Sequence, residues 1–353
     1  MDGTNMTNIL QFETEKAINQ RLPVVVFIAS VMIVGVIGNV HVLFIFWKLD
    51  KKPSIYSIFV KALAFVDLAT CVVHIPMEIT DLMLPYTYII VNGCKIFRYN
   101  QSFLLLVSVI LLALISYERY NRVCRIHKQQ LNPTRAKRII FLVVAMSIIF
   151  AFPVYFVNGH HIILLPGNVT GVMCFIADEY VGSTFLYFTY AILLLCFAVS
   201  ASFIIVSYIF ILKFLLKKRK VVMKYSGNNI DRRRNSSQAI EFNEPIEFFC
   251  TEVVTKPGLI GHERLRTVKT TKTLIIITGL FIIVFLPFVV LSACISSNPS
   301  FKDNMNAIEM TIYQIAIRLI LINNVANPFV YAFTDERFKQ KLKLCYHLNT
   351  TSE

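Results

Sequence analysis

The chain has 353 residues, of which 56% are hydrophobic and only 16% are charged, and its net charge is +14. An ordinary soluble domain has about 25% charged residues, and a soluble protein of this size could not bury so much apolar surface in one or two cores. The composition therefore excludes disordered, collagen-like and small disulfide-rich proteins, and it indicates an integral membrane protein.

Seven apolar stretches are long enough to cross a membrane, because a helical span needs about 20 apolar residues. They are continuous runs without the alternation of a transmembrane strand, which excludes a porin-like barrel. We therefore predict an all-α membrane protein with a bundle over residues 23–333, whose spans lie at about 23–47, 56–84, 97–120, 139–158, 184–212, 273–296 and 310–333.

Residues 1–22, before the first span, are polar and lack the apolar core of a cleavable signal peptide. They are predicted to form an extracellular tail, and the first span is expected to act as its own insertion signal. Residues 334–353, after the last span, are predicted to lie in the cytoplasm.

The basic residues fix the orientation of the predicted bundle, because cytoplasmic loops carry an excess of Lys and Arg. Most of the 35 basic residues fall in alternate connections and in the C-terminal tail, namely in 48–55, 119–138, 213–272 and 334–353. The N-terminus is therefore predicted outside and the C-terminus inside a multi-pass protein of the cell membrane. Basic residues that follow the inner loops in this way also argue against a nucleic-acid partner, which the isoelectric point of about 9.4 would otherwise suggest.

The segment 213–272 is the longest predicted inner loop. Its polar middle, 221–263, is expected to be flexible. Its two ends, Lys213–Lys220 and Glu263–Lys272, are expected to extend the fifth and sixth spans as helices.

Asp67 lies near the middle of the second span, where a charge is costly and marks a candidate functional group. It could be a protonated acid bonded to a neighbouring helix, or part of a hydrated polar core that binds a hard cation through oxygen ligands. Other spans offer polar groups for such a core at Asn39, Ser108, Asn323, Asn324 and Asn327. We expect an allosteric Na⁺ on Asp67, Ser108, Asn323 and Asn327 in the inactive state, and no other cofactor.

Two short motifs stand at the inner ends of spans. In Glu118-Arg119-Tyr120, where the third span leaves the membrane, Arg119 can pair with Glu118. In the seventh span, Pro328 removes a backbone hydrogen bond and Asn327 can help to satisfy the freed carbonyl. This second motif predicts a hinge, with a simple packing kink as the alternative.

Taken in chain order, these motifs resemble a rhodopsin-class (class A) G-protein-coupled receptor over about residues 23–346. The resemblance rests on Gly38-Asn39-Val40, Leu63-Ala64 with Asp67-Leu68, Glu118-Arg119-Tyr120, Tyr208, Phe281 with Phe285-Leu286-Pro287-Phe288, and Asn327-Pro328 with Tyr331. The sequence departs from the family at Phe285, where Trp is common, at Ser200, where Pro is common, and in span four, which lacks the usual Trp.

The resemblance implies a seven-transmembrane helix bundle with a short amphipathic eighth helix, and a receptor that activates heterotrimeric G proteins. Arrestin and receptor kinases would be further partners. The sixth span would swing outward near Pro287. The implied activation switch consists of Glu118, Arg119, Tyr120, Tyr208, Phe281, Phe285, Pro287, Asn327, Pro328 and Tyr331. No nucleophile elbow, Walker loop or metal-ligand spacing indicates an enzyme, and a channel or transporter would not need these motifs.

The resemblance also pairs Cys94, at the family spacing before Arg119, with Cys174 in the second outer loop. In some family members an acid holds the span-three Arg, and here Thr267 stands at that position. We therefore expect a weakly locked resting state with ligand-free signalling. Glu263, one turn earlier, is a further candidate partner for Arg119.

The same resemblance narrows the range of possible ligands. Amine receptors carry Asp where this chain has Gln101, and photoreceptors carry Lys where it has Leu321. The outer loop from His160 to Ser183 is long enough for a β-hairpin lid. A peptide is favoured, while a lipid, odorant or other small molecule, or charges that merely solvate the rim, are the alternatives. The candidate pocket residues are Gln101, Glu78, Asp81, Arg98, Glu309, Tyr313 and Arg318.

Four positions are candidates for covalent modification. Asn5 and Asn168 begin glycosylation sequons on predicted outer segments. Cys345 follows apolar residues in a basic amphipathic segment, where palmitoylation would add a membrane-lipid contact. Ser236 follows Arg233 and Arg234, a pattern typical of basic-directed kinases, although a solvated basic run is the alternative.

Overall fold

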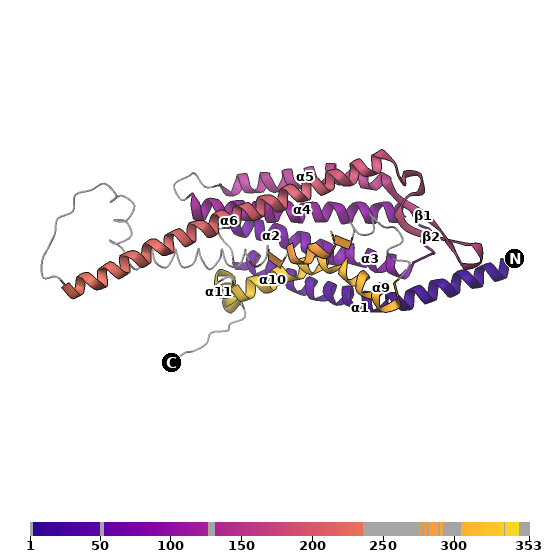
Figure 1. The fold of residues 1–353 in the computed structure, drawn as a ribbon, viewed down its shortest axis with the longest axis horizontal. Coiled ribbons are helices and arrows are strands. Elements are labelled where there is room, and N and C mark those ends of the chain that lie inside the picture. Colours follow the sequence, from indigo (N-terminus) through magenta and orange to yellow (C-terminus); the bar gives the residue numbers. More distant parts are fainter. Residues whose placement is uncertain are drawn as a thin grey trace.

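The computed structural model describes residues 3–49, 53–125, 131–235, 276, 279–280, 282–288, 290–291, 305–334 and 336–345. Within these residues, five helices are each long and apolar enough to cross a membrane, and a bent pair near the C-terminus makes a sixth. The described residues between 276 and 291 are helical as well, within the predicted sixth span. The helices run side by side along the long axis of the molecule, as a seven-helix bundle requires (Figure 1).

The first helix, α1, runs from Gly3 to Leu49 and is 47 residues long. It includes most of the predicted extracellular tail, which continues the first span as a helix. Helix-forming residues and local side-chain contacts explain the extension, since Gln11 Nε2 donates to Glu15 Oε1 over 3.0 Å and Glu13 lies 3.8 Å from Lys16. The outer part of α1 projects beyond the bundle at the N-terminal end (Figure 1).

The second span is interrupted by one wide turn. Helix α2 (Ile55–Ala69) leads into the π-helical segment η1 (Thr70–His74), and α3 (Ile75–Met83) completes the span. Pro76 has no N–H to donate to the preceding turn, and the π turn accommodates this loss by inserting one residue. The insertion rotates α3 so that Glu78 is buried.

Helix α4 (Val91–Cys124) is the predicted third span and contacts α2, α5 and α6. Helix α5 (Pro133–Val157) starts after Asn132, whose side chain accepts from Arg135 N over 2.7 Å. The largest apolar core lies between these helices and includes the buried residues Tyr56, Phe59, Leu63, Leu111 and Ile115.

A β-hairpin follows α5, in the loop whose length predicted one. Strand β1 (Asn158–Leu165) pairs antiparallel with β2 (Val169–Ile176) through the short turn η2 (Pro166–Asn168). The turn requires positive φ at Gly167 and Asn168, which are 73° and 59°. Tyr88 N also donates to Val172 O over 3.0 Å, so the connection after α3 joins the hairpin at the outer end of the bundle.

Helix α6 runs from Thr184 to Asn235 and continues well beyond the predicted fifth span. Residues 221–235, the first part of the segment expected to be flexible, are helical in the structure. The basic run from Lys217 to Lys220 favours the start of this extension, because Lys and Arg are good helix formers. The rest of the loop, with Ser236, Glu263 and Thr267, lies outside the described residues.

The last span is not one straight helix. Helix α9 (Ala307–Ala316) ends at a turn, and the 3-10 segment η5 (Leu319–Ile322) leads into α10 (Asn323–Thr334), with a bend of 42°. The amphipathic helix α11 (Glu336–Cys345) follows, as expected for an eighth helix. Its Phe338 is buried against Phe46 and Tyr331, at ring-centroid distances of 5.8 and 6.2 Å.

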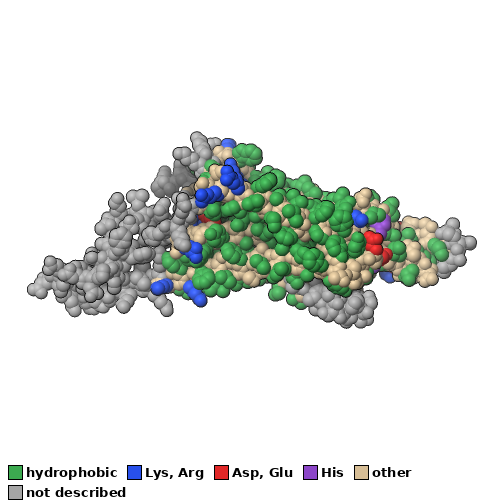
Figure 2. Space-filling view, turned by 90° about the horizontal axis from the view of Figure 1, so that it is seen from above, with side chains coloured by type: hydrophobic (Ala, Val, Ile, Leu, Met, Phe, Trp, Pro, Cys, Tyr) green, Lys and Arg blue, Asp and Glu red, His purple; other side chains and the backbone are tan. Residues whose placement is uncertain are grey.

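Hydrophobic side chains cover the length of the bundle on the face drawn in Figure 2. Trp47 is 85% exposed and Phe141 is 72% exposed, which would be unfavourable in water. Lys and Arg gather toward one end of this face, and acidic side chains lie near the other (Figure 2). This surface is that of a multi-pass membrane protein.

Candidate functional site

A buried ion pair joins α3 to the break in the last span. Arg318 contacts Glu78 Oε1 through Nε at 2.8 Å and Nη2 at 2.7 Å. Arg318 Nη1 also bonds both the backbone and the side-chain oxygen of Gln314. His74 Nε2 lies 3.9 Å from Glu78 Oε2, and its ring stacks on Phe97. A charge pair at this depth is favourable only with such additional partners.

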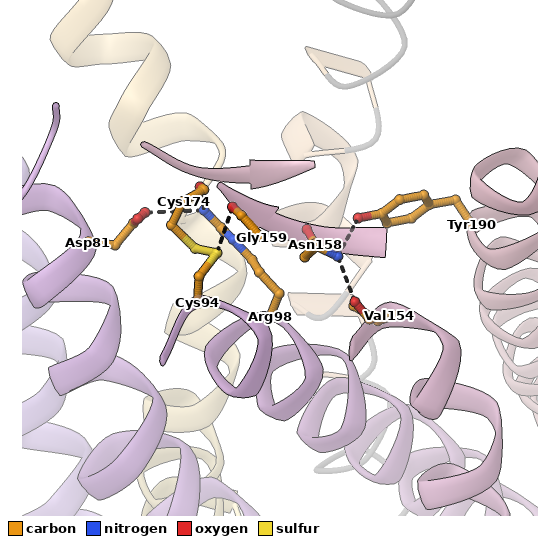
Figure 3. The surroundings of a disulfide bond; sticks show 8 residues. All are labelled: Asp81, Cys94, Arg98, Val154, Asn158, Gly159, Cys174 and Tyr190. Atoms are coloured by element: carbon orange, nitrogen blue, oxygen red, sulfur yellow. Dashed lines mark hydrogen bonds and ion pairs between the residues drawn. A yellow bond between two sulfur atoms is a disulfide. The ribbon is translucent and has the colours of Figure 1, made fainter. Parts of the chain in front are cut away.

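A second ion pair lies beside the outer disulfide (Figure 3). Arg98 Nη2 is 3.2 Å from Asp81 Oδ2 and 3.0 Å from Cys174 O. The disulfide expected between Cys94 and Cys174 is present, and it joins α4 to β2. Arg98 therefore links α3, α4 and the hairpin at one point.

The same outer region includes groups outside the predicted pocket. Arg21 on α1 donates to Leu82 O over 3.4 Å. Tyr88 is buried beneath the hairpin, and burial, together with the nearby Asp81 carboxylate, raises the pKa of its hydroxyl. Arg21 and His74 were missed because a basic residue at a helix end and a histidine in a span have many ordinary explanations. Pro76, a proline within the second span, could have indicated a distorted turn at η1, where His74 is buried.

The structure brings most of the predicted pocket residues to this outer end. Glu78 pairs with Arg318 and Asp81 with Arg98, while Tyr313 is buried on α9. Gln101 is half-buried on α4, three residues after Arg98.

Glu309, another predicted pocket residue, also has a structural role at the start of α9. Its carboxylate accepts from Asn306 N over 2.9 Å and completes a capping box at the start of α9. Its side chain is exposed. Glu309 therefore acts as a helix cap in the structure, and its predicted contact with a ligand stays a prediction.

A polar core lies in the middle of the bundle, where α1, α2 and α10 meet. Asn327 Nδ2 donates to Asp67 Oδ2 over 2.7 Å, and Asn39 Nδ2 donates to Asn324 O over 2.8 Å. Asp67 Oδ1 and Asn327 Oδ1 in this core are buried without a hydrogen-bond partner among the described residues, and so are Ser108 Oγ on α4 and Asn323 Oδ1 on α10. This set of oxygens fits the ligand chemistry of a hard cation.

At the other end of α4, Glu118 contacts two arginines. Arg119 Nε is 3.4 Å from Glu118 Oε2, and Arg122 Nη2 is 2.6 Å from Glu118 Oε1. The Arg119 guanidinium also lies 4.0 Å from the centre of the Tyr56 ring on α2. Tyr120 packs against Phe210 of α6. Tyr56 and Arg122 were missed because both resemble ordinary residues at helix ends.

The remaining predicted switch residues belong to α6, the sixth span and α10. Phe285 stacks on Phe197 of α6 with ring centroids 3.6 Å apart, and Pro287, two residues further along the span, is half-buried. Pro328 is so close to Gly38 that a Cβ there would approach its ring to 2.9 Å. Tyr331 is buried and Tyr208 is half-buried, while Phe281 lies outside the described residues.

The candidate modification sites are accessible where the structure describes them. Asn5 on α1 and Asn168 at the hairpin turn are exposed. Cys345, the last residue of α11, is half-buried beside the exposed Leu344.

Known proteins share the sequence features of this bundle. A family model described as the seven-transmembrane receptor of the rhodopsin family matches residues 38–331. The chain is 23% identical over 323 residues to neuromedin-U receptor 2 of Mus musculus, with 90% of this chain and 73% of that protein covered. It is 27% identical over 166 residues to nematocin receptor 2 of Caenorhabditis elegans, covering 45% of this chain and 42% of that protein.

Two further comparisons agree. Neuropeptide Y receptor type 6 of Mus musculus is 22% identical over 236 residues, which cover 65% of this chain and 61% of that protein. The crystal structure of squid rhodopsin aligns with a TM-score of 0.65 and 17% identity, covering 92% of this chain and 85% of that one. At this identity the structural likeness shows the fold.

Proposed function

Because this chain belongs to the rhodopsin family of seven-transmembrane receptors, we propose that it binds an extracellular peptide and activates heterotrimeric G proteins. The observation that carries the proposal is the line of buried polar groups along the bundle. It runs from the Glu78–Arg318 pair, through the core at Asp67, to Glu118 and Arg119. The family is one of signalling receptors and not of enzymes. The N-terminus lies outside the cell and the C-terminus in the cytoplasm, in line with the basic inner loops.

A peptide is supported by the chemistry of the outer end. Paired charges of both signs, the amide of Gln101 and the phenol of Tyr313 suit a ligand with many amide groups and mixed charges. Three relatives are a neuromedin-U, a nematocin and a neuropeptide Y receptor by name. A lipid, odorant or other small molecule is the alternative ligand for the same fold.

Signalling proceeds by a shift between two arrangements of the bundle. A ligand that contacts Arg318 acts directly on the break in the last span, because Arg318 lies at the turn between α9 and η5. The sixth span then moves outward about Pro287. Arg119 is released toward the G protein, and Tyr208 and Tyr331 turn toward it. A ligand stabilises this arrangement only by as much as it binds it better than the resting one.

We further propose that Na⁺ is held by Asp67, Ser108, Asn323 and Asn327 in the resting state. Their buried oxygens supply the hard ligands that this ion prefers. The ion would neutralise the Asp67 carboxylate within the bundle, and its preference for one arrangement would favour that arrangement. Asn5 and Asn168 are proposed as glycosylated, Cys345 as palmitoylated and Ser236 as phosphorylated, with arrestin and receptor kinases as regulatory partners.

The test is a peptide-library screen in cells that express the chain together with a promiscuous G protein. Guanine-nucleotide exchange that follows a peptide, and that an Arg119→Ala variant at equal surface expression lacks, is the expected result. Exchange triggered only by lipid extracts or small molecules would replace the peptide by the alternative ligand. An ion current without nucleotide exchange would contradict the proposed function itself.

A further inference from the structure

The resting position of Arg119 depends on more than its neighbour Glu118. We infer that Tyr56 is a positioning residue that holds Arg119 through its ring, while Arg122 competes with Arg119 for Glu118. This assignment deepens the proposed function and rests on it, because it concerns the group that is released toward the G protein.

The charges around Glu118 do not balance. One carboxylate faces two guanidinium groups, and Arg122 approaches it more closely, at 2.6 Å against 3.4 Å for Arg119. Neither Glu118 oxygen has a hydrogen-bond partner among the described residues, so both contacts are ion pairs, whose attraction increases as the distance falls. Glu118 therefore neutralises Arg122 in large part, and the attraction left for Arg119 is reduced.

Arg119 is nevertheless deeply buried, since its side chain is 3% exposed. Its Nε and Nη2 atoms have no hydrogen-bond acceptor among the described residues. A cation that is desolvated to this degree needs another source of attraction.

The ring of Tyr56 provides that source. The Arg119 guanidinium carbon lies 4.0 Å from the ring centre, well within the distance of about 6 Å at which a cation interacts with an aromatic face. Arg is well suited to this contact because its planar group stacks on aromatic rings.

Tyr56 is also held firmly in place. It is the second residue of α2, whose first turn is fixed by Ser54, with Ser57 N bonded to Ser54 Oγ over 3.2 Å. Its side chain is 2% exposed and belongs to the main apolar core. The ring is therefore a rigid surface that belongs to α2, while the guanidinium belongs to α4.

Activation has to separate these two groups, because Arg119 cannot lie on Tyr56 and reach the G protein at once. The ring should thus favour the resting state. Arg122 should disfavour it, because it weakens the Glu118–Arg119 pair. The two side chains act on the same equilibrium in opposite directions.

The experiment measures basal nucleotide exchange, without ligand and at matched surface expression. Tyr56→Leu should raise the basal rate about threefold to tenfold, as expected for the loss of a desolvated cation–π contact. Tyr56→Phe, which keeps the ring, should have the same basal rate as the wild type. Arg122→Gln should lower the basal rate, because Glu118 can then turn to Arg119.

Phe59→Leu is the matched control for lost packing, because Phe59 is 1% exposed in the same helix and core. It should lower thermal stability without the rise in basal rate. If Tyr56→Leu and Phe59→Leu change the basal rate equally, or if Tyr56→Phe behaves like Tyr56→Leu, the role of the ring is refuted. If Tyr56→Leu does not reach the surface, Arg122→Gln decides, and an unchanged or higher basal rate in that variant refutes the competition.

The two levels of the proposal fail in different ways. Absence of nucleotide exchange in every variant, with any G protein and any ligand, contradicts the proposed function. Ligand-stimulated exchange with unaltered basal rates in the Tyr56 and Arg122 variants contradicts only the positioning role.

Discussion

The contact between Glu78 and Arg318 shows how an ionisable side chain inside the bundle is stabilised by a partner of opposite charge. Glu78 is buried and the Arg318 side chain is only 11% exposed, and each has further polar partners in the neighbouring turns. Glu78 and Arg318 were candidates for a ligand site from the sequence, and in the structure they pair with each other through Glu78 Oε1, while Glu78 Oε2 has no hydrogen-bond partner among the described residues. Their pairing could not be predicted, because it depends on the extra residue in η1 and on the break after α9.

Glu78→Gln should therefore destabilise the protein by roughly 3–5 kcal/mol, since it leaves the Arg318 charge buried without its counter-ion. Thermal unfolding of the purified receptor in detergent would measure this. Asp81→Asn is the matched control, because the Asp81 side chain is 14% exposed and its loss should cost less. Equal stability of Glu78→Gln and wild type would mean that the pair contributes nothing to folding.

Asp67 gives a second prediction at this scale. Agonist affinity should fall when Na⁺ replaces a bulky organic cation at constant ionic strength, because the ion favours the resting arrangement. Asp67→Asn should abolish this sodium effect, since it removes the charge that faces the ion. Radioligand competition in the two buffers is the measurement. A variant that responds to Na⁺ as the wild type does would rule out Asp67 as an ion ligand.

The helices and strands differ in how well the sequence predicts them. Span four, which corresponds to α5, is a long and almost uninterrupted apolar run, so membrane length alone places it. The break near Arg318 and the π turn before Pro76 are invisible to that criterion, because hydropathy is insensitive to one missing or extra residue in a turn. The helical continuations of α1 and α6 beyond the membrane were missed or shortened for the converse reason, since polar helices carry no apolar signal.

The disulfide between Cys94 and Cys174 is the covalent link between the hairpin and the bundle. Cys174→Ala should sharply reduce surface expression or ligand binding, because removing a native disulfide typically costs about 2–5 kcal/mol in small domains. Flow cytometry and saturation binding would report the loss. Cys71→Ala, at a buried free cysteine, is a control for general effects of cysteine removal. Normal binding by Cys174→Ala would show that the link is dispensable.

For the whole molecule, the proposed function depends on a balance between a resting and an active arrangement. The family motifs contain the residues that would set this balance. The positions of Glu118, Arg119, Tyr208 and Tyr331 could be predicted because each occurs in a recognisable motif on the expected span. The contribution of Tyr56 could not, because it arises from the packing of α2 against α4 and leaves no pattern in either helix.

Thr267 allows that balance to be tested, although it lies outside the described residues. Thr267→Glu should lower basal nucleotide exchange, because a charge-assisted bond to Arg119 is worth about 1.5–3 kcal/mol against roughly 0.5–1.5 for a neutral one. Glu118→Gln should raise it. Both are measured at matched surface expression. An unchanged basal rate in Thr267→Glu, with a measurably active wild type, would exclude a lock of this kind.

The hairpin over the outer end has a consequence for kinetics. Strand β2 is fastened to α4 by the disulfide and to the connection after α3 by Tyr88 and Val172, and the hairpin also contacts α1. If the proposed ligand reaches Glu78 and Arg318 past this hairpin, the fixed sheet would stand beside its path both on entry and on exit. Ligand exchange should therefore be slow relative to diffusion, and reduction of the disulfide should shorten the residence time of a bound ligand more than it slows its arrival.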